Sequence, residues 1–394
     1  MNNIWSENKY LNTLINCLLF LVGINFLHYG QLILPIICFI LFIDNKLQFK
    51  VNNPKAFIIL CLFAVSFYAF SYQLGFYSVM GFTLPMAYYI GSNMKEVNEN
   101  NIKKIVYLFA ISMGAHIILT SIYEFIIHGA RGFFMSSTHY DVWTGEKIAN
   151  TTTAVNADIM IGCLYYLLFH EKNKRLKSLC LVVFALSMFY LLVIGRRTPV
   201  LMIGIAFIVS FLYEMVVLKR VSPKLRKSFI SLAVLLVVIV LCIVLIYSMN
   251  LFNLQTILKE YHIFQKFSQS FIDDERFSLL AQSFSLMGKY PFGGQHISAE
   301  LGQPIHDLLI DIYDYAGIVT CLITIVYCVV YLVNVYRVYK SDKVSNDFKV
   351  FMLGIYLCII IQMFIEPVMT GSSLFLIVAI IINALCERLL INEQ

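Results

Sequence analysis

The chain has 394 residues, of which 60% are hydrophobic and only 13% are charged, and its formal net charge is +6. A soluble domain is nearer half apolar and a quarter charged, so this composition, with a mean hydropathy of +0.78, excludes a water-soluble globular fold. Blocks such as residues 230–247 are continuously apolar and lack the alternation of a membrane β-barrel strand. The sequence predicts an all-α, polytopic membrane bundle, with residues 1–394 forming one integral membrane domain.

Apolar blocks recur along the chain, and one membrane crossing needs about 20 apolar residues. This predicts about 12 transmembrane helices. The first block has no small-residue cleavage pattern and is interpreted as a retained span. The second is short for a crossing and is expected to be tilted or re-entrant. The expected spans are residues 11–27, 31–43, 56–72, 74–91, 104–127, 152–169, 177–195, 199–218, 228–249, 304–335, 348–366 and 371–388.

Basic residues are distributed unevenly between the two sides. With the N-terminus in the cytoplasm, eight of the 29 Lys and Arg residues lie outside, and the other 21 lie inside as the positive-inside rule requires. Both termini are then cytoplasmic. The charge of +6 therefore reflects topology, and no nucleic-acid partner is indicated. The eight outer basic residues are Arg131, Lys147, Arg196, Arg197, Lys259, Lys266, Arg276 and Lys289.

All ten cysteines lie inside apolar blocks and form no CxxC pair. They are interpreted as buried small hydrophobes, so neither disulfides nor a thiol metal site is expected. No metal and no cofactor is predicted for this chain.

Two outer loops are long, 128–151 and 250–303, and long loops in compact proteins tend to be functional. Within the second, which precedes the tenth span, residues 273–288 read as an amphipathic helix with acids in its first turn and glycine at its end. One face carries an apolar series that should lie on the bundle or at the membrane interface. That series is Phe277, Leu280, Phe284 and Met287.

Three arginines on the outer face are candidate anion-binding residues. Arg196 and Arg197 occupy a short turn between two spans, where adjacent guanidiniums repel unless an anion lies between them. The alternative is contact with lipid headgroups. Arg276 lies in the first turn of the amphipathic helix, where the helix dipole does not favour a cation. A salt bridge to the neighbouring acids is the alternative there.

His306 follows Pro304 at the start of the tenth span, and proline suits a first helical turn. A histidine at a helix N-terminus is held neutral by the dipole, so it can accept a proton near pH 7. Asp307, Asp311 and Asp314 follow at helical spacing, which is costly unless they are protonated, hydrated or paired with arginine.

Further polar residues interrupt the predicted spans near their outer ends. Asn156 and Asp158 fall in the sixth span, and Glu366 precedes Pro367 at the end of the eleventh. Each is expected either to orient an arginine or to cap a helix.

Three segments, Ile194 to Leu201, Asp274 to Gly294 and Ile305 to Gly317, occur in that order on a twelve-span chain with a long outer loop before the tenth span. This pattern resembles the O-antigen ligase and polymerase superfamily of bacterial surface-polysaccharide glycosyltransferases. The topology match covers nearly the whole chain. Ligases of the family carry His-Asn where this chain has His306 and Asp307.

The resemblance implies a metal-independent glycosyltransferase of the bacterial cytoplasmic (inner) membrane, with its active site facing the periplasm or exterior. The substrates would be undecaprenyl-pyrophosphate-linked glycans, as donor and as acceptor. By the same resemblance Arg196, Arg197 and Arg276 bind the pyrophosphate and His306 is the catalytic base. Asp307, Asp311, Glu366 and Asp158 are supporting candidates, and a chain-length regulator and a flippase are candidate partners.

Three functions remain open at this stage. The Pro-Phe-Gly-Gly turn and the Leu-Leu-Ile-Asp-Ile-Tyr segment resemble polymerases of capsule and O-antigen clusters, so the preferred function is polymerisation of repeat units. One alternative is a ligase that transfers finished polymer to lipid A core in lipopolysaccharide. The other is a transporter or flippase for lipid-linked sugars, which would show internal repeats and a midplane site.

Overall fold

The computed structural model describes residues 2–71, 75–95, 97–136, 138–221, 275–303 and 307–392, together with 223, 226, 227, 229–231 and 305. Helices dominate these residues, as the sequence predicted, and the only β-structure there is one two-stranded hairpin. The N-terminal half contains α1 (Asn2–Gly23), η1 (Phe26–His28), η2 (Gly30–Ile33), α2 (Leu34–Asp44), α3 (Pro54–Ser71), α4 (Phe76–Met80), α5 (Thr83–Asn93), α6 (Glu99–Met135), β1 (His139–Tyr140), β2 (Lys147–Ile148), α7 (Asn150–Val155), α8 (Asp158–Phe169) and α9 (Lys174–Val193).

The remaining described elements are α10 (Thr198–Leu212), continued by a π-helical turn, η4 (Tyr213–Val217), then α14 (Glu275–Met287), α15 (His296–Leu301), α16 (Leu308–Lys340), α17 (Asn346–Ile365) and α18 (Ser373–Asn392).

Eight helices in the described ranges are long and apolar enough to cross a membrane. The first two expected spans correspond to shorter apolar helices over Tyr10–Gly23 and Gly30–Asp44. The expected span 74–91 is divided into α4 and α5. The expected span 228–249 lies largely outside the described residues. The chain is therefore a helical protein of the multi-pass membrane type.

α8 and α18 are the most enclosed of these helices, and they form the centre of the bundle. α8 packs against α17 and α18 packs against α5, while α16 lies against α3 and α6 against α9. The outer helices leave large apolar side chains exposed, for example Leu186 on α9 and Val329 on α16. An exposed apolar belt of this kind is the expected surface of a protein surrounded by lipid.

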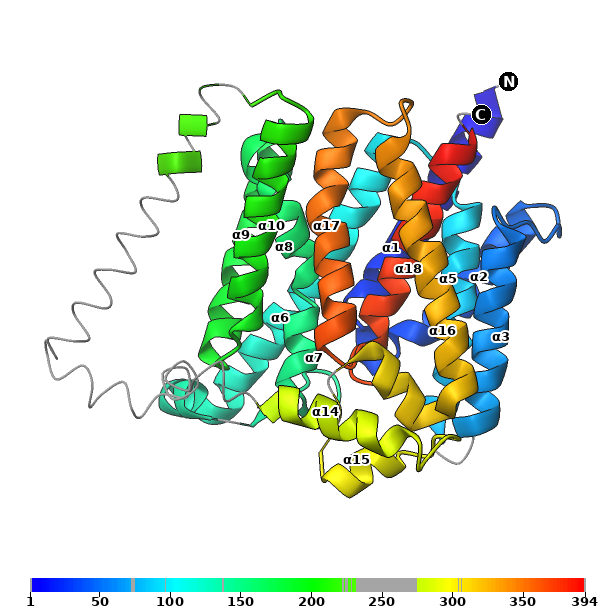
Figure 1. Cartoon of the computed structure of the whole chain (residues 1–394). Helices are drawn as coiled ribbons and strands as arrows, with labels where there is room; N and C mark the ends of the chain where they lie inside the picture. The colour runs from blue at the N-terminus through cyan, green and yellow to red at the C-terminus, as the bar shows by residue number, and fades with distance from the viewer. Residues whose placement is uncertain are drawn as a thin grey trace, which may run out of the picture.

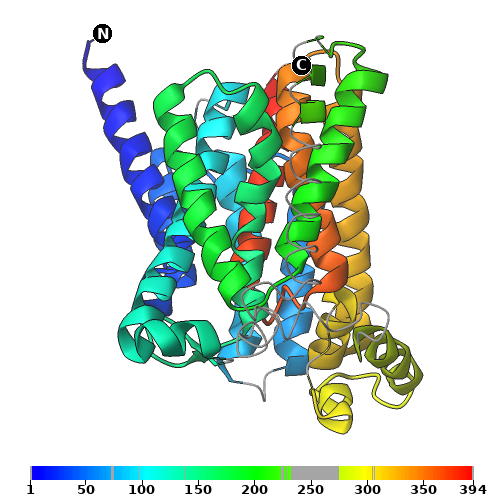
Figure 2. The same cartoon turned by 90° about the vertical axis from the view of Figure 1, so that its left-hand side faces the viewer.

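Both chain termini lie at one end of the bundle, and α14 and α15 lie across the opposite end (Figure 1). Figure 2, turned by 90°, shows the same arrangement, with the last part of α6 also running across that second end. α6 changes direction at Gly129, whose φ of 65° is outside the helical range. We call the end that carries α14 and α15 the distal end.

Candidate functional site

The two adjacent arginines follow a glycine that ends α9. Gly195 has a φ of 72°, its amide donates to the Leu192 carbonyl and the amide of Arg196 donates to the Leu191 carbonyl, both at 2.9 Å. This is a Schellman motif, in which a left-handed glycine terminates a helix and satisfies its last carbonyls. The next helix begins at Thr198 with Pro199 in its first turn, so the predicted short turn is confirmed.

Arg196 has an acidic partner from a distant part of the chain. Its Nη2 lies 2.8 Å from Oε1 of Glu366, and the Glu366 side chain is only 2% exposed. α17 ends at Ile365 because the residue before a proline, here Glu366, is pushed out of the helical region. Glu366 orients Arg196, which is one of the two roles expected for it.

A second buried polar pair adjoins this one. Asp158, at the start of α8, accepts a hydrogen bond of 2.5 Å from Nε2 of Gln362 on α17, and both residues are fully buried. The two helices approach closely because Gly162 and Gly354 face each other, and a Cβ on Gly354 would lie 2.3 Å from the Gly162 carbonyl oxygen. The glycine contact therefore brings Asp158 beside Gln362.

The loop after Glu366 connects this cluster to the start of α16. The Thr370 hydroxyl donates to Oδ1 of Asp311 at 2.6 Å, and the Thr370 amide donates to Oδ2 at 3.1 Å. The hydroxyl of Thr152 donates to the carbonyl of Gly371 in the same loop at 2.6 Å. Segments near residues 152, 196, 311 and 370 thus meet at the distal end.

α16 begins later than the sequence predicted. Its first residue is Leu308, and Asp307 is the N-cap, with Oδ1 accepting from the amides of Leu309 (2.8 Å) and Ile310 (3.1 Å). The expected start at 304 is therefore wrong, because Asp307 supplies the capping oxygen. Burial raises the pKa of Asp307 above its ordinary value, although the two amide donors oppose this. His306 and Pro304 lie outside the described residues.

The acidic series on α16 is stabilised by hydrogen-bond donors rather than by arginine. Asp311 is held by Thr370, as above. Asp314 accepts from the backbone amides of Ile297 (2.8 Å) and Ser298 (3.3 Å), which begin the short helix α15. Neutral donors thus take the place of the arginine partner that the sequence suggested, and each carboxylate joins a different segment to α16.

α14 covers Glu275–Met287 of the expected helix 273–288, and Arg276 is in its first turn. The positions of Asp273 and Asp274 lie outside the described residues. The predicted apolar face is only partly correct. Leu280 and Met287 pack against the α15 and α16 cluster, but Phe284 is 59% exposed and Leu279 and Ser283 are buried instead.

The Pro-Phe-Gly-Gly turn is inserted at a break in α16. Gly317 has a φ of 73°, which interrupts the helical hydrogen bonds there. The turn replaces them: the amide of Ile318 donates to the Pro291 carbonyl at 2.9 Å, and the amide of Gly294 donates to the Tyr315 carbonyl at 3.1 Å. A Cβ on Gly293 or Gly317 would lie within 2.6 Å of the opposing backbone, so both positions require glycine.

A further polar cluster was not predicted from the sequence. Glu124, buried in α6, accepts from the amide of Tyr140 at 2.5 Å and lies 3.6 Å from Nδ1 of His139. Nε2 of His116 lies 3.1 Å from Oδ2 of Asp141. These contacts attach the hairpin of β1 and β2 to α6. Glu124 belongs to a mainly apolar segment, and its charge was the only sequence signal.

Sequence reasoning also missed Gln362 and Thr370, because an amide in an apolar block and a loop hydroxyl carry no motif. Among the described residues no group of three His, Cys, Asp or Glu side chains is arranged to hold a metal ion. The groups at the distal end are arginine, carboxylates and neutral donors, an arrangement that suits charge-assisted hydrogen bonding. In comparisons with known proteins, no family model and no curated protein matches the chain.

Proposed function

We propose that the protein is a polysaccharide polymerase that joins undecaprenyl-pyrophosphate-linked repeat units at the outer face of a bacterial cytoplasmic membrane, for O-antigen or capsule. One observation carries the proposal. The turn with Arg196 and the start of α16, which are more than 100 residues apart in sequence, are joined at one end of the bundle through Glu366, Thr370 and Asp311. These are two of the three segments on which the family resemblance rests.

The roles follow from the chemistry of the transfer. A sugar hydroxyl of the acceptor attacks the anomeric carbon of the donor, and the bond from that carbon to the pyrophosphate oxygen breaks. Negative charge collects on the leaving pyrophosphate, where the guanidiniums of Arg196, Arg197 and Arg276 stabilise it. His306 takes the hydroxyl proton. Glu366 and Asp158 support Arg196, and Asp307 and Asp311 support the start of α16.

The proposed topology has twelve crossings with both termini in the cytoplasm. The common end of the two termini supports an even number of crossings (Figure 1). The uneven basic charge supports the assignment of that end to the cytoplasm. The distal end then faces the periplasm or exterior, where the lipid-linked substrates would be presented.

The test is the pattern of glycan on the carrier lipid in cells that express each variant. We expect His306→Ala to insert normally but to leave single repeat units on the carrier. His296→Ala is the matched control, because His296 is an exposed histidine on α15 at the same end. Unchanged polymer ladders with His306→Ala would overturn the proposal.

The same assay separates the alternative functions. Loss of a ligase leaves long polymer on the carrier, whereas loss of a polymerase leaves single units. Elongation of purified lipid-linked repeat by the purified protein, without an ion gradient, distinguishes an enzyme from a transporter.

A further inference from the structure

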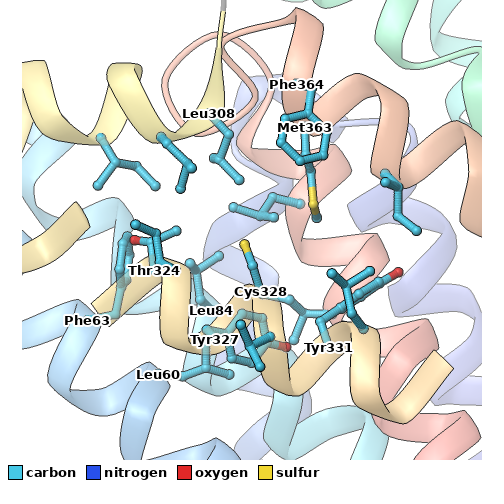
Figure 3. A pocket seen from close by; sticks show the side chains of 18 residues that line it. Leu60, Phe63, Leu84, Leu308, Thr324, Tyr327, Cys328, Tyr331, Met363 and Phe364 are labelled. Atoms are coloured by element: carbon cyan, nitrogen blue, oxygen red, sulfur yellow. The ribbon is translucent and has the colours of Figure 1, made fainter. Parts of the chain in front are cut away.

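Figure 3 shows an apolar cavity of about 220 Å³ beside the break in α16. Leu308 and Ile312 contribute from the segment before the break, and Cys328 contributes from the segment after it. On a straight helix residues 312 and 328 would lie about 24 Å apart. The break at Gly317 is therefore what allows both segments of α16 to line one space, together with α3, α5, α17 and α18.

Only three hydroxyl groups, those of Thr324, Tyr327 and Tyr331, are among the side chains that line the cavity. Its wall is formed mainly by Leu, Ile, Phe and Met side chains. The hydroxyl of Thr324, which is on the wall, already donates to the carbonyl of Thr320 at 2.8 Å. A sugar or a phosphate would lose most of its hydrogen bonds to water there without replacement, at a cost of several kcal/mol. A hydrocarbon chain would lose none.

The rim of the cavity faces the lipid. Val329 and Leu332 on α16 are 55% and 47% exposed, and Phe364 on α17 is 61% exposed. Both helices are long and apolar enough to cross a membrane. The other end of the cavity reaches Leu308, which directly follows the N-cap Asp307. The cavity thus connects the hydrocarbon region with the start of α16.

We propose that this cavity holds the part of the substrate's polyprenyl chain nearest its pyrophosphate. The inference rests on the proposed function, because only a lipid-linked substrate would place a chain in the cavity and its anionic head at the arginines. A phospholipid acyl chain is equally apolar. Its headgroup, however, gives no reason for the cavity to end at the start of α16, beside the N-cap Asp307.

A photo-crosslinking experiment on the full chain tests the proposal. A diazirine amino acid replaces Val329, and a matched control replaces Ile208 on α10, whose exposure of 54% is nearly the same. The protein is reconstituted in phosphatidylglycerol vesicles that contain a trace of radiolabelled undecaprenyl phosphate. We expect about tenfold more label at position 329 than at position 208. Unlabelled undecaprenyl phosphate should remove the label, and added phosphatidylglycerol should not.

Equal labelling at the two positions would overturn the proposal, because it would show contact with bulk lipid only. Competition by phosphatidylglycerol as strong as that by undecaprenyl phosphate would also overturn it. This readout needs no catalysis. If His306→Ala loses its polymer ladders but position 329 shows no selective label, the role of the cavity alone is contradicted. If position 329 is selectively labelled but His306→Ala keeps its ladders, the proposed function alone is contradicted.

A filling variant gives an independent measurement. Cys328→Trp places an indole in the cavity, and Ile208→Trp adds the same group to a lipid-facing surface elsewhere. We expect Cys328→Trp to raise the KM for a long-chain substrate about tenfold while the KM for a short-chain analogue changes little. An equal effect on both substrates, or an equal effect of the control, would contradict the cavity's role.

Discussion

Arg196 and Glu366 form a partly buried ion pair, in which Glu366 is nearly inaccessible and Arg196 is 14% exposed. A buried ion pair is weak evidence for stability, because desolvation offsets much of the attraction. Its clearer effect is to fix the orientation of the planar guanidinium. An arginine held in this way is prepared to bind a second acidic group, such as a pyrophosphate, in a defined geometry.

The variant Arg196→Lys separates these two roles. Lysine keeps the charge, and with it an ion pair to Glu366, but it lacks the fork that binds two phosphate oxygens. We expect polymer formation to fall at least about tenfold with little change in thermal midpoint. Arg131→Lys, at an exposed position of α6, is the control. Full activity of Arg196→Lys would show that the bidentate role is wrong.

The pKa of Asp141 depends on burial and on its hydrogen-bond partners, which act in opposite directions. Burial opposes its ionisation, but the hydrogen bond and charge of His116 and the amides of Trp143 and Thr144 outweigh burial and lower its pKa. Ionised Asp141 is therefore favoured by folding. Its stabilisation is complete above the unfolded pKa of about 3.9 and is lost as the pH falls through the lower folded value.

We therefore expect Asp141→Asn to reduce stability at pH 7 by about 1 to 2 kcal/mol, because a charge-assisted hydrogen bond is removed. The difference from the unmodified protein should shrink below pH 4 and vanish at lower pH. Thermal midpoints of the purified protein between pH 3 and 8 measure this. Glu146→Gln, an exposed acid in the same loop, should show no such dependence. A pH-independent loss in Asp141→Asn would contradict the assignment.

At the scale of elements, the break in α16 depends on a turn that is distant from it in sequence. The turn at residues 291–294 replaces the helical hydrogen bonds lost at Gly317. The two backbones can approach this closely only because Gly293 in the turn and Gly317 in the helix have no Cβ. The first part of α16 can then tilt without leaving buried backbone groups unpaired. That tilt forms the cavity and sets the position of Asp307 and Asp311.

Two glycine substitutions separate backbone strain from steric fit. Gly317 and Gly129 have nearly the same backbone angles, φ 73° and ψ −174° against φ 65° and ψ 176°, but no atom lies within 4 Å of a Cβ on Gly129, whereas a Cβ on Gly317 would lie 2.5 Å from the Pro291 carbonyl oxygen. We expect Gly129→Ala to cost about 1 to 3 kcal/mol from its backbone conformation alone. Gly317→Ala should cost about 1 to 3 kcal/mol more. Equal losses in thermal midpoint would show that the turn does not pack at the break.

The sequence was sufficient for the helical membrane class, the turn at Gly195 and the helix over Glu275–Met287, because apolar block length, glycine and amphipathic spacing are local signals. It was not sufficient for contacts between distant segments. Gln362 with Asp158 and Thr370 with Asp311 pair through the packing of α8, α16 and α17, which no local pattern encodes. The start of α16 was misplaced because Pro304 and Asp307 both suit a helix start, and the capping bonds of Asp307 decide it.

At the scale of the whole molecule, the basic loops and the outer-face segments expected from the sequence fall at opposite ends of the helical bundle. Both termini are at one end, and the Arg196 turn, α14 and α15 are at the other (Figure 1). The structure separates the two ends, and the positive-inside rule alone favours the end with both termini as the cytoplasmic one.

This arrangement predicts which positions an impermeant thiol reagent reaches in intact cells. Ser285 on α14 and Ser341 after α16 are both accessible in the folded chain but lie at opposite ends. We expect Ser285→Cys to be labelled in intact cells and Ser341→Cys to be labelled only after permeabilisation. The native cysteines among the described residues give a low background because they lie in apolar helices. Labelling of Ser341→Cys in intact cells would invert the topology and would place the arginines in the cytoplasm, where the proposed outer-face substrate could not meet them.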